Sequence, residues 1–243
     1  MQQKLYFENS RGDKLSGILS GDFISAIILC HGSASSKESS TYVRLENELN
    51  KHDVATFRFD FYGHGESEGK YEDITVSEMV DDILHARALL EKKGYSSIGL
   101  FGSSMAGQAC EIAATSGKFY ALVIRSGVSD YLNLIKSRIS VSEWRAKGYA
   151  SLGRGSPRLK YAFFEDLKQY SPDQIGAAIS VPTLFVHGDA DLEVPVGQSI
   201  RMTTLVPNST LKIIKGADHR QTNHFDIMID SVVRFILKNS ERV

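Results

Sequence analysis

Short apolar runs alternate with helical patterns along most of this 243-residue sequence. Residues 23–30 read FISAIILC, a continuous β-branched run that is typical of a strand covered on both faces. Apolar residues then recur at helical spacing within residues 76–90, and again within 225–236 near the end of the chain. Because strands that alternate with helices usually pair in parallel, this order predicts an α/β protein with a mostly parallel sheet.

Two segments depart from this alternation. Residues 3–8 and 14–19 alternate weakly around the turn signal NSRGD, which predicts an antiparallel hairpin. Residues 129–178 contain no convincing strand and are rich in aromatic, polar and basic side chains. We interpret that segment as a helical cap, or lid, inserted into a core made of residues 1–128 and 179–243, where it could cover the mouth of a site.

The composition excludes several classes of protein. Hydrophobic residues make up 42% of the chain and the net charge is −1, so no global charge favours nucleic acid or an anionic membrane. Cys30 and Cys110 lack metal-ligand spacing and are expected as small core residues in a reducing compartment. The first 20 residues lack a signal-peptide core, and no run of about 18 apolar residues occurs. We therefore expect a cytoplasmic protein with no membrane span and no nucleic-acid partner.

Residues 96–114, SSIGLFGSSMAGQACEIAA, pass from a strand-like run through a sharp corner into a helical pattern. A serine on such a strand-to-helix turn has an exposed hydroxyl, and its neighbours two positions away must be small. Gly102 and Ala106 meet that condition for Ser104, so the motif G-x-S-x-G is present with alanine at its last place. Ser103 is the alternative nucleophile, and a turn without chemical importance is the alternative interpretation.

A nucleophilic serine needs a histidine that accepts its proton and a carboxylate that orients the histidine. In one common arrangement the chain order is serine, acid, histidine. Downstream of Ser104, the segment VPTLFVHGDADLEVPV offers Asp189 and Asp191 as the acid. The segment TLKIIKGADHRQTNHF offers His219 as the base, with His224 as a rival. Both loops follow strand-like runs, where sites in open parallel sheets gather.

Attack on a carbonyl also requires N–H donors that stabilise the negative oxygen. The residue after the nucleophile, Met105, supplies one expected donor. The loop after the strand at residues 23–30 supplies the other, and the turn at His31 and Gly32 makes the N–H of Ser33 the candidate. A plain strand-ending turn is the alternative interpretation of this loop.

Five pieces of the sequence resemble α/β-hydrolases of the small carboxylesterase, cinnamoyl (feruloyl) esterase and monoacylglycerol lipase type. These pieces are HGSASS, FDFYGHGES, GSSMAG, HGDADLEVP and GADH, spread from residue 31 to residue 219. The resemblance implies a central sheet of about eight strands and selects Ser104, Asp191 and His219 as the catalytic residues over their rivals. Ala106 and Tyr62 depart from the usual glycine and arginine of that family.

The resemblance implies a serine esterase that acts through an acyl-enzyme on a small-molecule ester, with no metal and no cofactor. A thioesterase or a peptidase of the same fold is the alternative, and a non-catalytic small-ligand receptor is the alternative of another class. A homodimer is left open. The sequence offers His31, Trp144, Tyr149 and Phe163 as substrate-binding residues, although such aromatic side chains can equally attach a cap to the core.

The cap sequence is also locally basic. The residues are Lys136, Arg138, Arg145, Lys147, Arg154, Arg158 and Lys160, against the single acid Glu143. This excess could steer an anionic substrate such as an acyl coenzyme A, or it could be a solvated helical face.

Overall fold

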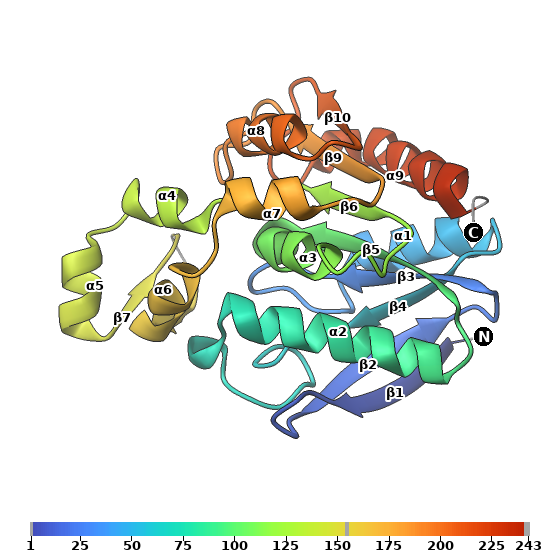
Figure 1. Cartoon of the computed structure of the whole chain (residues 1–243), viewed down its shortest axis with the longest axis horizontal. Helices are drawn as coiled ribbons and strands as arrows, with labels where there is room; N and C mark the ends of the chain where they lie inside the picture. Colours follow the sequence, from blue (N-terminus) through green and yellow to red (C-terminus); the bar gives the residue numbers. More distant parts are fainter. Residues whose placement is uncertain (1, 154–155, 241–243) are drawn as a thin grey trace.

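The computed structural model describes residues 2–153 and 156–240 of the chain. These residues form an eight-stranded sheet with the order β1-β2-β4-β3-β5-β6-β9-β10 (Figure 1). The strands are β1 (Gln2–Glu8), β2 (Lys14–Ser20), β3 (Ser25–Cys30), β4 (Ala55–Phe59), β5 (Ser97–Ser103), β6 (Leu122–Arg125), β9 (Thr183–Gly188) and β10 (Ser209–Ile214).

From β4 to β10 all neighbouring strands are parallel, whereas β1 and β2 form an antiparallel hairpin at one edge. The α/β class and the mostly parallel sheet are therefore confirmed. Every residue of β4, β5 and β9 is buried, as expected for strands that helices cover on both faces.

Helices cover both faces of the sheet (Figure 1). The core helices are α1 (Ser40–Asn50), α2 (Val76–Lys92), α3 (Gly107–Ala114), α8 (Gly197–Leu205) and α9 (Phe225–Ser240). Successive residues of β3 divide between two hydrophobic cores, with Ile28 facing α2 and α3, and Ile27 and Leu29 facing α1 and α9. Within the described residues, every helix is too short or too polar to cross a bilayer.

Most of the segment between β6 and β9 projects beyond the end of the sheet (Figure 1). Its elements are α4 (Tyr131–Lys136), α5 (Val141–Lys147), β7 (Tyr149–Ser151), β8 (Arg158–Lys160), α6 (Tyr161–Leu167) and α7 (Pro172–Ala178). Residues 129–178 were expected to lack strands, but β7 and β8 pair as a two-stranded antiparallel ribbon. Each strand has only three residues, which is too short to give a recognisable pattern.

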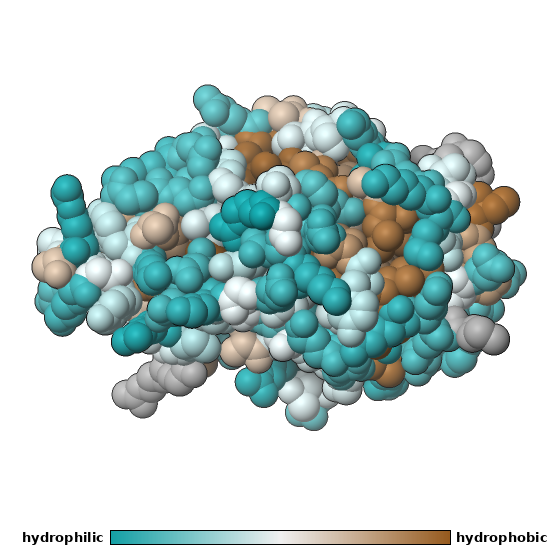
Figure 2. Space-filling view, turned by 90° about the horizontal axis from the view of Figure 1, so that it is seen from below, coloured by the Kyte–Doolittle hydropathy of each residue, from teal (hydrophilic) through white to brown (hydrophobic). Residues whose placement is uncertain are grey.

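The expected limits of the cap also need adjustment. Helix α7 packs against α3 and α8 of the body, so the projecting part ends before Pro172. Hereafter the cap means residues 129–171. Hydrophilic residues cover most of the face of the molecule seen in Figure 2, including the end that carries the cap.

Candidate active site

Strand β5 ends at Ser103 and is followed at once by the 3₁₀ turn η2 (Ser104–Ala106) and by α3. Ser104 has a φ of +51°, a left-handed conformation that non-glycine residues rarely adopt. The helix folds back closely on the strand, since a β-carbon on Gly102 would lie 2.6 Å from Sγ of Cys110. Small residues at 102 and 106 are thus what allow the strand to turn sharply into the helix and present the serine.

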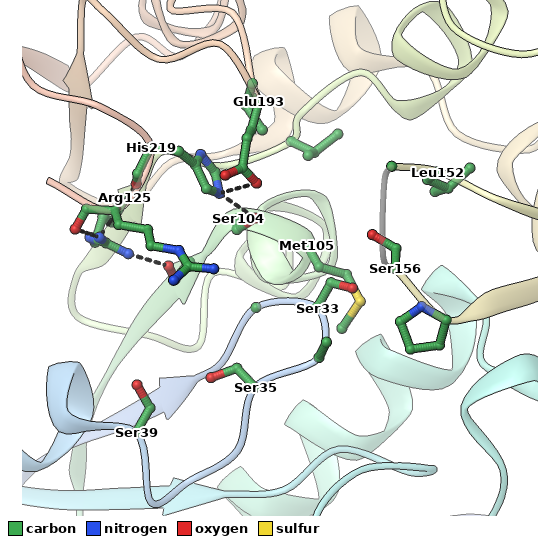
Figure 3. Close-up of a pocket in the computed structure, with 18 of the residues that line it drawn as sticks. Ser33, Ser35, Ser39, Ser104, Met105, Arg125, Leu152, Ser156, Glu193 and His219 are labelled. Atoms are coloured by element: carbon green, nitrogen blue, oxygen red, sulfur yellow. Dashed lines mark hydrogen bonds and ion pairs between the residues drawn. The ribbon is translucent and has the colours of Figure 1, made fainter. Parts of the chain in front are cut away.

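The structure brings Ser104, His219 and Asp191 together from three separate loops (Figure 3 shows the first two). The Nε2 atom of His219 lies 2.9 Å from Oγ of Ser104, although 115 positions separate the two residues. The Nδ1 atom of His219 lies 2.8 Å from Oδ2 of Asp191. Because Nδ1 faces a carboxylate, we assign the ring proton to Nδ1, which leaves the Nε2 lone pair facing the serine hydroxyl.

The rival residues make other contacts. Oγ of Ser103 accepts a hydrogen bond from Arg125 at 3.0 Å. Oδ1 of Asp189 accepts the N–H of Gly216, and the Asp189 side chain is exposed. His224 closes the short turn η3 (Thr222–His224) that precedes α9. None of the three joins the contacts of Ser104 with His219.

Asp191 accepts four hydrogen bonds. Its Oδ1 receives the backbone N–H groups of Glu193 and Val194, both at 2.8 Å. Its Oδ2 faces Nδ1 of His219 and, at 3.1 Å, Nε2 of His187. Burial alone would raise the pKa of Asp191, but the hydrogen bonds from His187, His219 and Val194 together hold that pKa well below its usual range. The carboxylate therefore stays ionised and keeps one orientation.

The loop after β3 lies directly beside the serine. A β-carbon on Gly32 would lie 3.1 Å from Cβ of Ser104, so only a glycine fits there without displacement. Ser33 and Met105 both border the same cavity as Ser104 (Figure 3). Within residues 2–153 and 156–240, the N–H of Ser33 donates to no protein acceptor. The Ser33 hydroxyl lies 2.5 Å from the hydroxyl of Tyr71, which fixes this side of the site.

Comparisons with known proteins agree with this architecture. The family described as serine aminopeptidase, S33 matches residues 22–128. The structure of Est1E from Butyrivibrio proteoclasticus with ferulic acid bound superposes with a TM-score of 0.88 at 24% identity, covering 97% of this chain and 98% of that one. The Pyrococcus furiosus esterase Pf2001 gives a TM-score of 0.76 at 21% identity, over 99% of this chain and 93% of that one. The chain has the α/β-hydrolase fold.

One curated relative is also similar over most of its length. An uncharacterised 31.7 kDa protein of Escherichia coli, from the traX-finO intergenic region, is 24% identical, and the match covers 83% of each chain.

In this α/β-hydrolase fold, a cavity of about 1320 Å³ opens at Ser104, beneath the cap. The cap contributes mainly apolar side chains to its wall, namely Tyr131, Leu134, Ile139, Leu152, Leu159 and Phe163. The loop after β3 and the start of α1 contribute hydroxyl groups, from Ser35, Ser39, Ser40 and Thr41. The cavity thus has an apolar wall and a polar wall, with the serine bordering both.

Of the four residues suggested for substrate binding, only Phe163 lines this cavity. His31 is fully buried, where its Nδ1 contacts the carbonyl oxygen of Gly32 and its Nε2 accepts the N–H of Phe61. Burial, followed by the nearby His64, lowers the pKa of His31 to about 3. His31 is therefore a neutral support for the loop.

Trp144 and Tyr149 also lie away from this cavity, and both border a smaller one of about 390 Å³ within the cap. Trp144 is buried and donates its indole N–H to the carbonyl of Leu159, so it holds the cap together. Tyr149 is exposed and stacks beneath the guanidinium of Arg158.

Three of the six described basic residues that the sequence analysis named in the cap are paired with acids. Arg158 contacts Glu72 at 3.2 Å, Lys160 contacts Asp73 at 2.5 Å, and Lys147 contacts Glu143 at 3.2 Å. Arg154 lies outside the described residues. Among the described basic residues of the cap, only Arg138 borders the large cavity, and it donates to the backbone oxygen of Glu193. The paired cations therefore give little support to steering by the cap.

Three residues at the site were not anticipated from the sequence. His187 shares the carboxylate of Asp191, and Oε2 of Glu193 lies 3.9 Å from Nε2 of His219. Arg125 lines the cavity from the end of β6. Arg125 could have been found from the sequence, because it ends the apolar strand-like run ALVIR and polar residues at strand ends often serve a site. Nothing in the sequence distinguished His187 from an ordinary core histidine.

Proposed function

We propose that this chain is a serine hydrolase that cleaves carboxylic esters through an acyl-enzyme, with Ser104 as nucleophile, His219 as general base and Asp191 as the orienting acid. The contacts at 2.9 Å and 2.8 Å that link these three side chains are the observation that carries the proposal. The position of the serine on a strained turn beside a large cavity supports it further.

In the first half of the reaction, Oγ of Ser104 attacks the ester carbonyl carbon while Nε2 of His219 accepts the hydroxyl proton. The carbonyl oxygen becomes negative and is stabilised by the N–H groups of Ser33 and Met105. Collapse of this intermediate breaks the bond to the alcohol, which leaves with the proton from His219. The product of this half is an ester between the acyl group and Ser104.

In the second half, His219 removes a proton from water, and the resulting hydroxide attacks the acyl carbon. The bond to Oγ then breaks, and His219 returns its proton to Ser104 as the carboxylic acid departs. Asp191 remains ionised throughout and stabilises the imidazolium form of His219. The four hydrogen bonds to its carboxylate support this role.

The apolar wall supplied by the cap supports an acyl group that is aliphatic or aromatic. The ferulic acid bound to the similar Est1E is an aromatic acid, which favours the inclusion of feruloyl esters among the test substrates. The description of the matching family favours peptides or amino-acid amides as a second substrate class.

A fluorophosphonate probe and p-nitrophenyl esters from acetate to decanoate test the proposal, together with a feruloyl ester, an acyl coenzyme A and an aminoacyl amide. Ester hydrolysis and probe labelling should both vanish in Ser104→Ala. They should persist in Ser231→Ala, because Ser231 is only partly buried on α9 and its hydroxyl donates to the carbonyl of Ile227 within the same helix. Absence of both turnover and labelling in the wild type would instead favour a ligand-binding receptor.

A further inference from the structure

Arg125 lies at the end of β6 with a side chain that is only 6% exposed. It contacts the residue next to the proposed nucleophile and the backbone of the loop that carries the proposed base. Its Nη1 donates to Oγ of Ser103, the residue before the nucleophile, at 3.0 Å. Its Nη2 donates to the backbone oxygens of Arg220 at 2.6 Å and of His219 at 3.4 Å (Figure 3). One guanidinium therefore joins the end of β5 to the loop that carries the histidine.

The acceptors of this guanidinium are all neutral. Its Nε donates to Oε1 of Gln221 at 3.2 Å, and within the described part of the chain no carboxylate lies within ion-pair distance of Arg125. A buried charge without a direct ion pair stabilises a fold poorly compared with an apolar side chain of similar size. Burial lowers the pKa of Arg125, as expected for a cation in such surroundings. Stability alone is a poor explanation for an arginine here.

The backbone around Arg125 is strained at two non-glycine residues. Gln221 has a φ of +56° and Ser126 has a φ of +45°. Gln221 is fully buried, and its Nε2 donates to Oγ of Ser126 at 3.3 Å. Such conformations persist only where surrounding contacts fix them. The hydrogen bonds of Arg125 with Gln221 and with the carbonyls before it provide that fixation.

We infer that Arg125 is a positioning residue that holds the His219 loop in register with the strand end carrying Ser104. The effect on catalysis rests on the proposed function. The link that Arg125 forms between Ser103 and the His219 loop, hereafter the clamp, is a claim about structure alone. Without Arg125, the carbonyls of His219 and Arg220 lose their donor and the loop gains freedom to move. Nε2 of His219 would then spend less time within hydrogen-bond distance of the serine hydroxyl.

Hydrogen exchange tests the clamp without reference to activity. In folded Arg125→Ala, the amides of Gln221, Thr222 and His224 should exchange faster by about tenfold or more, because a hydrogen bond from a charged donor is lost nearby. Arg87→Ala is a matched control, since Arg87 also donates to a loop carbonyl, that of Lys118, but on a distant surface. Unchanged exchange of residues 217–224 in Arg125→Ala would overturn the inference.

Steady-state kinetics test whether the clamp affects catalysis. A displacement of about 1 Å can lower kcat about 10²-fold, so Arg125→Ala should lose kcat on this scale with little change in KM. Millimolar guanidinium should restore much of the loss, whereas urea, which is planar but uncharged, should restore less. A folded variant that keeps wild-type kcat would overturn the inference, and so would a loss that guanidinium leaves unchanged.

Arg125→Lys provides a second variant in case Arg125→Ala does not fold. Lysine retains the charge but cannot reach all the acceptors of the planar guanidinium, so exchange and kcat should change in the same directions by smaller amounts. If the wild type cleaves no ester, the proposed function fails, and the exchange experiment still decides whether Arg125 holds the loop.

Discussion

Replacement of Asp191 by asparagine gives the sharpest test of the site, because the surrounding donors dictate how the new amide must lie. Oδ1 of Asp191 receives two backbone N–H groups, from Glu193 and Val194. The amide oxygen of the introduced asparagine must take this position, since an NH₂ group there would leave both backbone donors unpaired. An NH₂ group at the Oδ2 position loses only the contact with His187, whose Nε2 also faces the carbonyl of Val194. The NH₂ group therefore faces Nδ1 of His219 and forces the ring proton onto Nε2, opposite the serine hydroxyl.

A histidine in this tautomer cannot accept the proton of Ser104. The equivalent change in a serine protease lowers kcat about 10⁴-fold, which corresponds to about 5.5 kcal/mol of transition-state stabilisation. We expect a loss of similar size in Asp191→Asn. Hydrolysis of p-nitrophenyl butyrate at pH 7 to 8 measures it, and the thermal midpoint establishes that the variant is folded.

Asp189→Asn is the matched control, because the exposed side chain of Asp189 bonds, within the described residues, only to the N–H of Gly216. Its kcat should stay within about threefold of the wild type, as for most surface substitutions. Similar losses in the two variants, or a loss below about tenfold in Asp191→Asn, would refute the tautomer argument.

Two further predictions concern the support of the site. Glu111 is fully buried on α3, the helix that follows Ser104, and accepts a hydrogen bond from Ser129 at the start of the cap. Burial raises the pKa of Glu111 to about 8 from 4.5, so its contribution to stability falls as pH rises from about 4.5 to about 8 and is level above that range. Glu111→Gln should flatten the dependence of the thermal midpoint on pH over this window, and parallel curves for the two proteins would contradict the argument. Gly32→Ala places a methyl group 3.1 Å from Cβ of Ser104 and should lower kcat by roughly 10- to 100-fold. Gly197→Ala, whose β-carbon would meet no atom within 4 Å, should leave kcat unchanged, and equal effects of the two substitutions would show that crowding is not the cause.

The sequence predicted the parts of the molecule whose structure is determined by residues that are neighbours in the chain. The buried parallel strands have apolar runs, and the turn at Ser104 needs small residues, which Gly102 and Ala106 supply visibly in the sequence. The loops with Asp191 and His219 follow strands that end at the same edge of the sheet, so their meeting with Ser104 could be anticipated from topology. Their roles in catalysis remain predictions.

The parts that the sequence could not predict depend on the direction of individual side chains. His31 follows a strand at the site edge, yet its ring turns inward to meet Phe61 and Gly32. Trp144 satisfies its indole N–H within the cap, which no pattern in the sequence indicates. The contact of Arg125 with the His219 loop joins residues 94 apart, and only the folded chain makes it visible.

The left-handed backbone at Ser104 has an evolutionary consequence. An L-residue in this conformation costs about 1 to 2 kcal/mol that a glycine would largely avoid. Selection for a higher free energy of unfolding would therefore favour replacement of Ser104, the residue that bears the proposed nucleophilic oxygen. A lineage of this protein that no longer needed its chemistry should accept glycine or asparagine at position 104 early, and the loss would be hard to reverse because the simplified chain would be the more stable one.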